Sequence, residues 1–119
     1  MSRILVIDDE SEILELIEFE IKILGHEVVT TNSPIHALKL LGDYQNQFDL
    51  VLCDVVMPGK NGIDFAREVN RIPWFEGHIA FMSSYTDALA QEFKDVGVTQ
   101  VLRKPFDLQK LMSFFAEVC

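Results

Sequence analysis

Groups that could do chemistry follow four short apolar runs of the sequence. They are two adjacent carboxylates, a third carboxylate, a pair of hydroxyls and an ammonium, contributed by Asp8 and Asp9, Asp54, Ser83 and Ser84, and Lys104. Ionised carboxylates about 4 Å apart repel each other by roughly 4 kcal/mol at an effective dielectric of about 20. Three of them are stable side by side only with a cation, and their hard oxygens prefer Mg²⁺ or Mn²⁺. If the fold brings these groups together, they predict a divalent metal site.

The same groups are typical of phosphoryl chemistry. The carboxylate of Asp54 could attack phosphorus, and it needs no general base because an aspartate is already ionised at pH 7. The metal ion and Lys104 would neutralise charge on the phosphoryl oxygens, and Ser83 would donate a hydrogen bond to a third oxygen. Zinc chemistry is not expected, because no Cys and His residues have the spacing of a zinc site.

The apolar runs have the composition of strands that are buried on both faces of a parallel sheet. They are continuous rather than alternating, most are rich in β-branched or aromatic residues, and they cover residues 4–7, 50–53, 79–82 and 98–102. A fifth, more polar stretch at residues 27–31 suits an edge strand. Cys53 lies inside one run and is expected to be a small buried core residue.

Helical patterns separate these strands. The expected helices are residues 11–24 with Ser11 as the cap and Gly25 at the end, residues 34–41 between Ser33 and Gly42, residues 63–70, residues 89–96 before Gly97, and a last helix capped by Asp107. Strand and helix alternate five times, which predicts a doubly wound α/β sandwich with right-handed crossovers. The functional site of such a fold lies at the carboxyl ends of the strands, near the topological switch point.

In the last helix the apolar positions form a stripe of Leu108, Leu111, Met112 and Phe115. Phe114 falls outside this stripe, so it is either an exposed contact for a partner or a residue packed at the edge of the core.

Length and charge limit the function further. The 119 residues fit one domain, residues 1–119, and no apolar run is long enough for a membrane span or a signal peptide, so we expect a cytoplasmic protein without membrane contact. The net charge of −9 argues against nucleic acid as a ligand, because phosphate binding needs a basic surface. Acidic clusters favour cations or basic partners instead.

The sequence resembles the receiver domain of bacterial two-component response regulators, and the resemblance runs from Arg3 to the last helix. The matching motifs are ILVIDD at residues 4–9, DVVMPGKNG at 54–62, the pair Ser83–Ser84, and LRKPF at 102–106. The resemblance implies a flavodoxin-like fold, in which a five-stranded parallel sheet of order 2-1-3-4-5 is flanked by five helices.

The resemblance also implies a role for each candidate residue. Asp54 would accept a phosphoryl group from the phosphohistidine of a sensor histidine kinase or a histidine phosphotransfer protein, Lys104 would contact the phosphate, and Ser83 would move toward it. Mg²⁺ (or Mn²⁺) would be held by Asp8 or Asp9, by Asp54 and by the main-chain carbonyl of Val56. The family's Lys-Pro bond is usually cis, which we expect here for Lys104–Pro105. No turnover of a separate substrate is expected.

Two features depart from the family pattern. The aromatic switch residue three positions before the lysine is replaced by Val101, so a phosphoryl group would act through Ser83 on the following loop and on the helix 89–96. Val56 and Tyr85 stand where the family lines the path of the hydrolytic water, and they offer no carboxamide or carboxylate to orient it. We therefore predict slow loss of the phosphoryl group.

Partners are expected to meet the surface of the domain itself, because the chain ends with its fifth helix and no output domain follows. The chain would act as a stand-alone regulator of a downstream protein target or as a carrier in a phosphorelay. Five glutamates around the first helix form either a solvated face or a docking surface for a basic partner helix: Glu10, Glu12, Glu15, Glu18 and Glu20.

Two other classes of function remain as alternatives. A receiver-like scaffold could serve as a phosphorylation-independent interaction module. A phosphatase of the haloacid-dehalogenase kind also uses a strand-end aspartate, but it needs a second aspartate where this chain has Val56. A flavodoxin-like flavin protein is discarded, because Asp8, Asp9 and Glu10 would repel a phosphate from the loop after the first strand.

Overall fold

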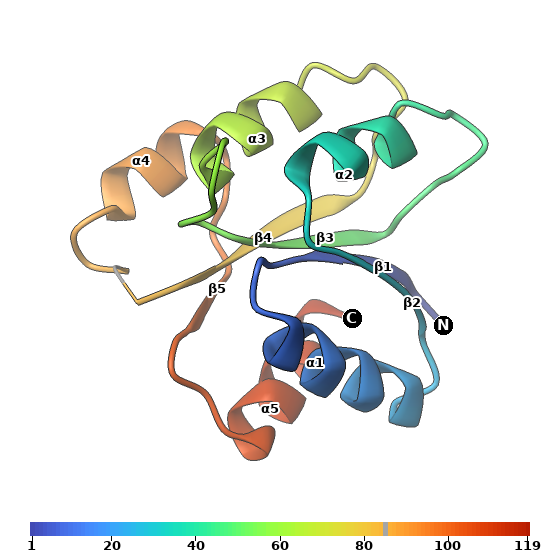
Figure 1. Cartoon of the computed structure of the whole chain (residues 1–119), viewed down its shortest axis with the longest axis vertical. Coiled ribbons are helices and arrows are strands. Elements are labelled where there is room, and N and C mark those ends of the chain that lie inside the picture. Colours follow the sequence, from blue (N-terminus) through green and yellow to red (C-terminus); the bar gives the residue numbers. More distant parts are fainter. Residues whose placement is uncertain (85) are drawn as a thin grey trace.

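Strands and helices alternate along the whole chain in the computed structural model, which describes residues 1–84 and 86–119 (Figure 1). The strands are β1 (Arg3–Ile7), β2 (Glu27–Thr31), β3 (Leu50–Asp54), β4 (His78–Ser83) and β5 (Val101–Arg103). The helices are α1 (Ser11–Ile23), α2 (Pro34–Leu41), α3 (Gly62–Val69), α4 (Ala90–Asp95) and α5 (Leu108–Val118). Each predicted strand and helix is therefore present.

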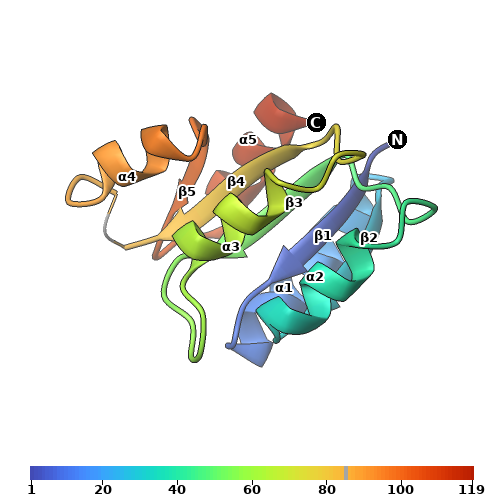
Figure 2. The same ribbon diagram turned by 90° about the horizontal axis from the view of Figure 1, so that it is seen from above.

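The five strands form one parallel sheet in the order β2-β1-β3-β4-β5. Helices α1 and α5 cover one face of the sheet, and α2, α3 and α4 follow one another across the other face (Figures 1 and 2). This arrangement confirms the doubly wound, flavodoxin-like fold. All strands run in the same direction, but β2 lies on one side of β1 and β3 on the other, which places the topological switch point between β1 and β3.

The core lies on both faces of the sheet because side chains of a strand alternate between its faces. In β1, Leu5 and Ile7 pack with the cluster under α2, α3 and α4, whereas Ile4 and Val6 pack with the cluster under α1 and α5. All five residues of β3 are buried, including Cys53 as predicted. The central strands are thus fixed on both sides, and their carboxyl ends form a rigid base for polar side chains.

Helix caps agree with the sequence at two helices and disagree at one. Ser33 caps α2 by accepting a hydrogen bond from the N–H of His36, and Asp107 caps α5 by accepting one from the N–H of Lys110. The prediction that Ser11 caps α1 is wrong, because Ser11 is the first residue of that helix and Glu10 precedes it. The physical reason is that Asp8 accepts the N–H of Glu10 and turns the chain one residue earlier.

The start of β5 was predicted three residues too early. Val98 is buried, but its N–H donates to the carbonyl of Phe93 and so completes the end of α4. Gly97, with φ of 77°, makes the turn that this hydrogen bond closes. An apolar residue that finishes a helix looks the same in the sequence as one that begins a strand.

The last helix buries a different set of residues from the predicted stripe. Leu111 and Phe115 are buried as expected, but Leu108 and Met112 are 47% and 48% exposed. Phe114 is 9% exposed and meets the ring of Phe115 edge to face at 5.5 Å. It therefore packs at the edge of the core, which decides between the two interpretations left open by the sequence.

Among residues 1–84 and 86–119, none of the helices combines the length and the apolar character that a membrane crossing requires.

Candidate functional site

The polar groups that follow the strands gather at one edge of the sheet, as the sequence predicted. They line a depression of about 300 Å³ at the carboxyl ends of β1, β3, β4 and β5, formed by Asp9, Glu10, Asp54, Val56, Ser83, Ser84 and Lys104. A larger hollow of about 700 Å³ lies at the opposite end of the strands, near Trp74 and His78. None of the candidate residues lines that larger hollow, so size alone does not identify the site.

Asp54 is the last residue of the buried strand β3 and is only 5% exposed. Its Oδ1 accepts a hydrogen bond from the N–H of Val56 at 3.4 Å, which turns the carboxylate toward the depression. Gly62 allows α3 to begin directly over the end of β3, because a Cβ at this position would lie 2.6 Å from the carbonyl oxygen of Asp54. The N–H of Gly62 closes this turn by donating to the carbonyl of Val55.

The two adjacent aspartates after β1 have different environments. Asp8 is fully buried, and its two oxygens accept hydrogen bonds from the N–H of Glu10 and from the ammonium of Lys104, both at 2.9 Å. Asp9 is exposed and lines the depression. Both carboxylate oxygens of Asp8 are therefore engaged by the protein itself, whereas Asp9 lies exposed at the depression.

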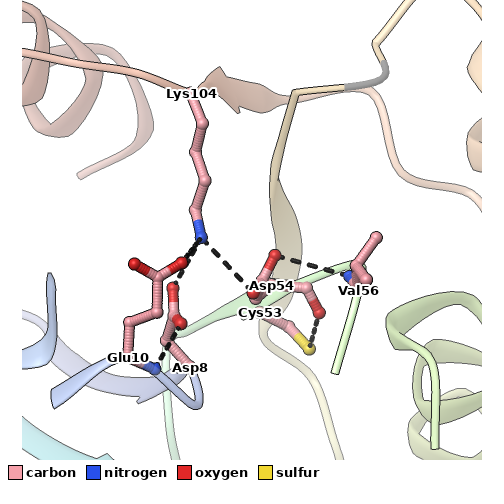
Figure 3. A network of polar contacts seen from close by, with 6 residues as sticks. All are labelled: Asp8, Glu10, Cys53, Asp54, Val56 and Lys104. Atoms are coloured by element: carbon pink, nitrogen blue, oxygen red, sulfur yellow. Dashed lines mark hydrogen bonds and ion pairs between the residues drawn. The ribbon is translucent and has the colours of Figure 1, made fainter. Parts of the chain in front are cut away.

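Lys104 brings the acidic groups of two strands together (Figure 3). Its Nζ lies 2.9 Å from Asp8, 3.3 Å from Asp54 and 3.7 Å from Glu10. The N–H of Lys104 donates to the carbonyl of Ser83, which ties the end of β5 to the end of β4. The Lys104–Pro105 peptide bond is cis, as expected.

Charge balance in the site favours a further cation. Burial, together with the nearby charge of Asp8, raises the pKa of Asp54 to about 6, although Lys104 acts against both. Burial also raises the pKa of Asp8 despite its hydrogen bonds. For Lys104, burial lowers the pKa, but Asp8 and Asp54 outweigh it and the net pKa is raised. One ammonium therefore does not compensate the carboxylates around it.

The donor set fits a hard divalent cation. Carboxylate oxygens of Asp8, Asp9 and Glu10 lie within 4.8 Å of one another, and Asp9 lines the depression together with Asp54 and Val56. Oxygen donors of this kind suit Mg²⁺ or Mn²⁺. Cys53 is no ligand candidate, because its buried thiol donates to the carbonyl of Asp54 and burial raises its pKa well above the ordinary value.

Glu10 is the group that sequence reasoning did not assign to the site. It was interpreted as part of the acidic first helix and as one of the charges that would repel a phosphate after the first strand, yet it contacts Lys104 and lines the depression. The available signal was its position directly after Asp8 and Asp9, since a turn at the end of a parallel strand points successive side chains toward the same edge.

The other residues that the sequence assigned to the site line the depression or pack next to it. Ser83 is 2% exposed and lines the depression. Val56 is 60% exposed at the rim, and Tyr85 lies outside the described residues. Val101 is half-buried, pairs with Phe81 of β4 and packs against the core on the α4 side, so an aliphatic side chain occupies the predicted switch position.

Known proteins share both the sequence pattern and the fold. The family model of the response regulator receiver domain matches residues 4–116. The chain is 34% identical over 112 residues to the DNA-binding transcriptional regulator NtrC of Azospirillum brasilense, covering 94% of this chain and 23% of the relative. It is 29% identical over 121 residues to the response regulator SaeR of Staphylococcus aureus, covering 94% and 48%. The chain thus spans less than half of the length of these relatives.

Solved structures agree with this relationship. The chemotaxis response regulator CheY4 of Vibrio cholerae superimposes with a TM-score of 0.91 at 28% identity, covering 100% of this chain and 99% of that one. A response regulator receiver domain protein from Clostridium thermocellum superimposes with a TM-score of 0.84 at 32% identity, covering 99% and 94%. The family match along nearly the whole chain, together with this shared fold, shows that the chain belongs to the response regulator receiver domains of two-component signal transduction.

Proposed function

We propose that residues 1–119 form one cytoplasmic receiver domain in which Asp54 is the phosphoacceptor. The observation that carries this proposal is the position of its carboxylate, at the end of a buried strand and 3.3 Å from the ammonium of Lys104. A carboxylate oxygen of Asp54 attacks phosphorus of a phosphohistidine, the P–N bond breaks, and the imidazole nitrogen keeps the electron pair. Lys104 neutralises charge on the transferred phosphoryl group, and Ser83 donates to one of its oxygens.

The proposal includes a divalent cation beside the phosphoacceptor. Asp9 and Asp54 would hold Mg²⁺ or Mn²⁺ with the main-chain carbonyl of Val56, while Asp8 supports the site from behind because both of its oxygens are engaged. When bound, the cation neutralises charge on the phosphoryl oxygens during transfer. The protein's own contribution is position: the buried ends of β1 and β3 hold these carboxylates in place before a donor arrives.

Signalling would pass through the surface next to the site. Ser83 ends β4, and its carbonyl accepts the N–H of Lys104, so a movement of this pair toward a phosphoryl group displaces the start of the loop before α4. A downstream protein would bind the changed surface. The phosphoryl donor is a sensor histidine kinase or a histidine phosphotransfer protein.

Acetyl phosphate with Mg²⁺, followed by intact mass, tests the proposal. The wild-type chain should gain one phosphoryl group, and Asp54→Asn should gain none. Asp64→Asn is a matched control, because Asp64 is an exposed aspartate of α3 that pairs with Arg67. A gain retained by Asp54→Asn would contradict the assignment. An unmodified wild type would favour an interaction module, and turnover of a free phosphate ester would favour a phosphatase.

We expect Val56→Asn to speed the loss of the phosphoryl group by about tenfold, because a carboxamide at the rim can orient the attacking water. Val56 is 60% exposed, so the substitution should leave the fold intact. The measurement is the decay of the phosphorylated mass after removal of the donor. Wild-type decay within seconds, or an unchanged rate in the variant, would contradict the predicted part of Val56 in slow dephosphorylation.

A further inference from the structure

Glu10 extends the acidic site beyond the groups that hold the phosphoryl group. Its carboxylate lies 3.7 Å from the Nζ of Lys104, across that nitrogen from Asp54, and its side chain is 61% exposed (Figure 3). Glu10 and Lys104 line both the depression at Asp54 and an adjoining groove of about 370 Å³ that includes Ile13 and Phe106. A donor that approaches Asp54 along this groove passes Glu10.

The charge of Glu10 is close enough to act on a donor. The contacts of Lys104 with Glu10 and Asp54 share one nitrogen, so the two carboxylates lie within about 7 Å of each other. Three carboxylates contact the ammonium of Lys104, those of Asp8, Glu10 and Asp54, and the carboxylate of Asp9 lies beside those of Asp8 and Glu10. Even with a divalent cation the site keeps one net negative charge, and Glu10 is the carboxylate that faces the incoming group.

We propose that Glu10 selects the phosphoryl donor by charge, disfavouring strongly anionic donors relative to donors whose leaving group carries a positive charge. This inference rests on the proposed function of Asp54. Glu10 is a positioning residue: it holds Lys104 from the side opposite Asp54 and sets the local field, and it forms no bond to phosphorus. The protein donor that fits is a phosphohistidine on a surface that carries Lys or Arg opposite Glu10.

Two small phosphoryl donors, acetyl phosphate and phosphoramidate, differ in the charge of the donor and of its leaving group. With acetyl phosphate, Asp54 attacks phosphorus, the P–O bond breaks, and acetate leaves with the electron pair and a negative charge. With phosphoramidate, the P–N bond breaks and the protonated nitrogen leaves as neutral ammonia. At neutral pH phosphoramidate therefore carries one negative charge fewer than acetyl phosphate. A unit charge about 7 Å away changes the relative rates by about three- to tenfold at an effective dielectric of about 35–80.

The test compares initial rates with acetyl phosphate and with phosphoramidate at saturating Mg²⁺, read by intact mass. Glu10→Gln should raise the acetyl phosphate to phosphoramidate rate ratio about three- to tenfold, and Glu10→Asp should stay near the wild-type ratio because it keeps the charge. The change should shrink as NaCl rises from about 20 to 500 mM, since salt screens an exposed charge. Calorimetric titration should show weaker Mg²⁺ binding in Glu10→Gln by about two- to fivefold.

Glu12→Gln is the matched control, because Glu12 is an exposed acid in the first turn of α1 and makes no contact with Lys104 among the described residues. An unchanged ratio in Glu10→Gln, an equal change in Glu12→Gln, or a salt-independent change would overturn the inference while leaving Asp54 as the phosphoacceptor. A wild type that takes a phosphoryl group from neither donor would overturn both.

Discussion

Replacing Lys104 by methionine should lower the free energy of unfolding of the metal-free protein by about 2–3 kcal/mol at pH 7.5. Methionine keeps most of the volume of the side chain but leaves the fully buried carboxylate of Asp8 without its cation. Asp54, 3.3 Å from the same ammonium, loses its partner as well. Removing one member of a buried ion pair is costly because the remaining charge stays desolvated.

Two further measurements separate this cause from a packing defect. The loss should become smaller on going from pH 7.5 to pH 5, because Asp54, with a pKa of about 6, then becomes neutral. Added Mg²⁺ should restore much of the stability, and its removal with a chelator should reverse the gain, since the cation can replace the missing ammonium.

Lys60→Met is the matched control for urea unfolding of this variant. Lys60 pairs with Glu68 at 2.9 Å, but this pair is partly exposed, and we expect a loss below about 1 kcal/mol. Equal losses in both variants, or a Lys104→Met loss that is unaffected by both pH and Mg²⁺, would show that charge compensation is not what Lys104 contributes.

The fold was predictable from the sequence because each strand carries its own signal. A continuous apolar run such as residues 50–53 is stable only when buried on both faces, and alternation with helices then requires a parallel sheet. The convergence of Asp54 and Lys104 follows from the same rule, since the carboxyl ends of parallel strands share one edge. Residues far apart in the chain therefore meet for a reason that is visible in their local contexts.

The sequence left a point open, or missed it, where the decisive contact is not local. Phe114 is buried because α5 turns a second face toward the core, which depends on how the helix is placed against the sheet. Val98 finishes α4 rather than beginning β5, and only the hydrogen bond to Phe93 distinguishes the two. Glu10 joins the site because Lys104 reaches across from another strand. Each outcome depends on tertiary geometry that propensity and spacing do not contain.

Asp54→Asn should stabilise the metal-free protein at neutral pH by about 1–3 kcal/mol, although it removes the proposed phosphoacceptor. Burial raises the pKa of Asp54 to about 6, from an ordinary value of 3.8. A raised folded-state pKa means that folding favours the protonated form. The stability that the folded protein gains from neutral Asp54 is fully present below the ordinary pKa. It is lost as the pH rises through the folded-state pKa, because the buried carboxylate must then ionise next to Asp8.

The wild-type protein without metal should therefore lose stability between about pH 4 and pH 7, whereas Asp54→Asn lacks this part of the loss. The two proteins should be closest in stability near pH 4, and the variant should lead at pH 7.5. Saturating Mg²⁺ should reverse the order at pH 7.5, since Asp54 is a ligand of the proposed cation and the variant should bind it more weakly. Thermal unfolding over this pH range, with chelator and with Mg²⁺, measures both effects. A wild type more stable than the variant at pH 7.5 in chelator would mean that Lys104 already compensates the charge of Asp54 and that the site needs no further cation.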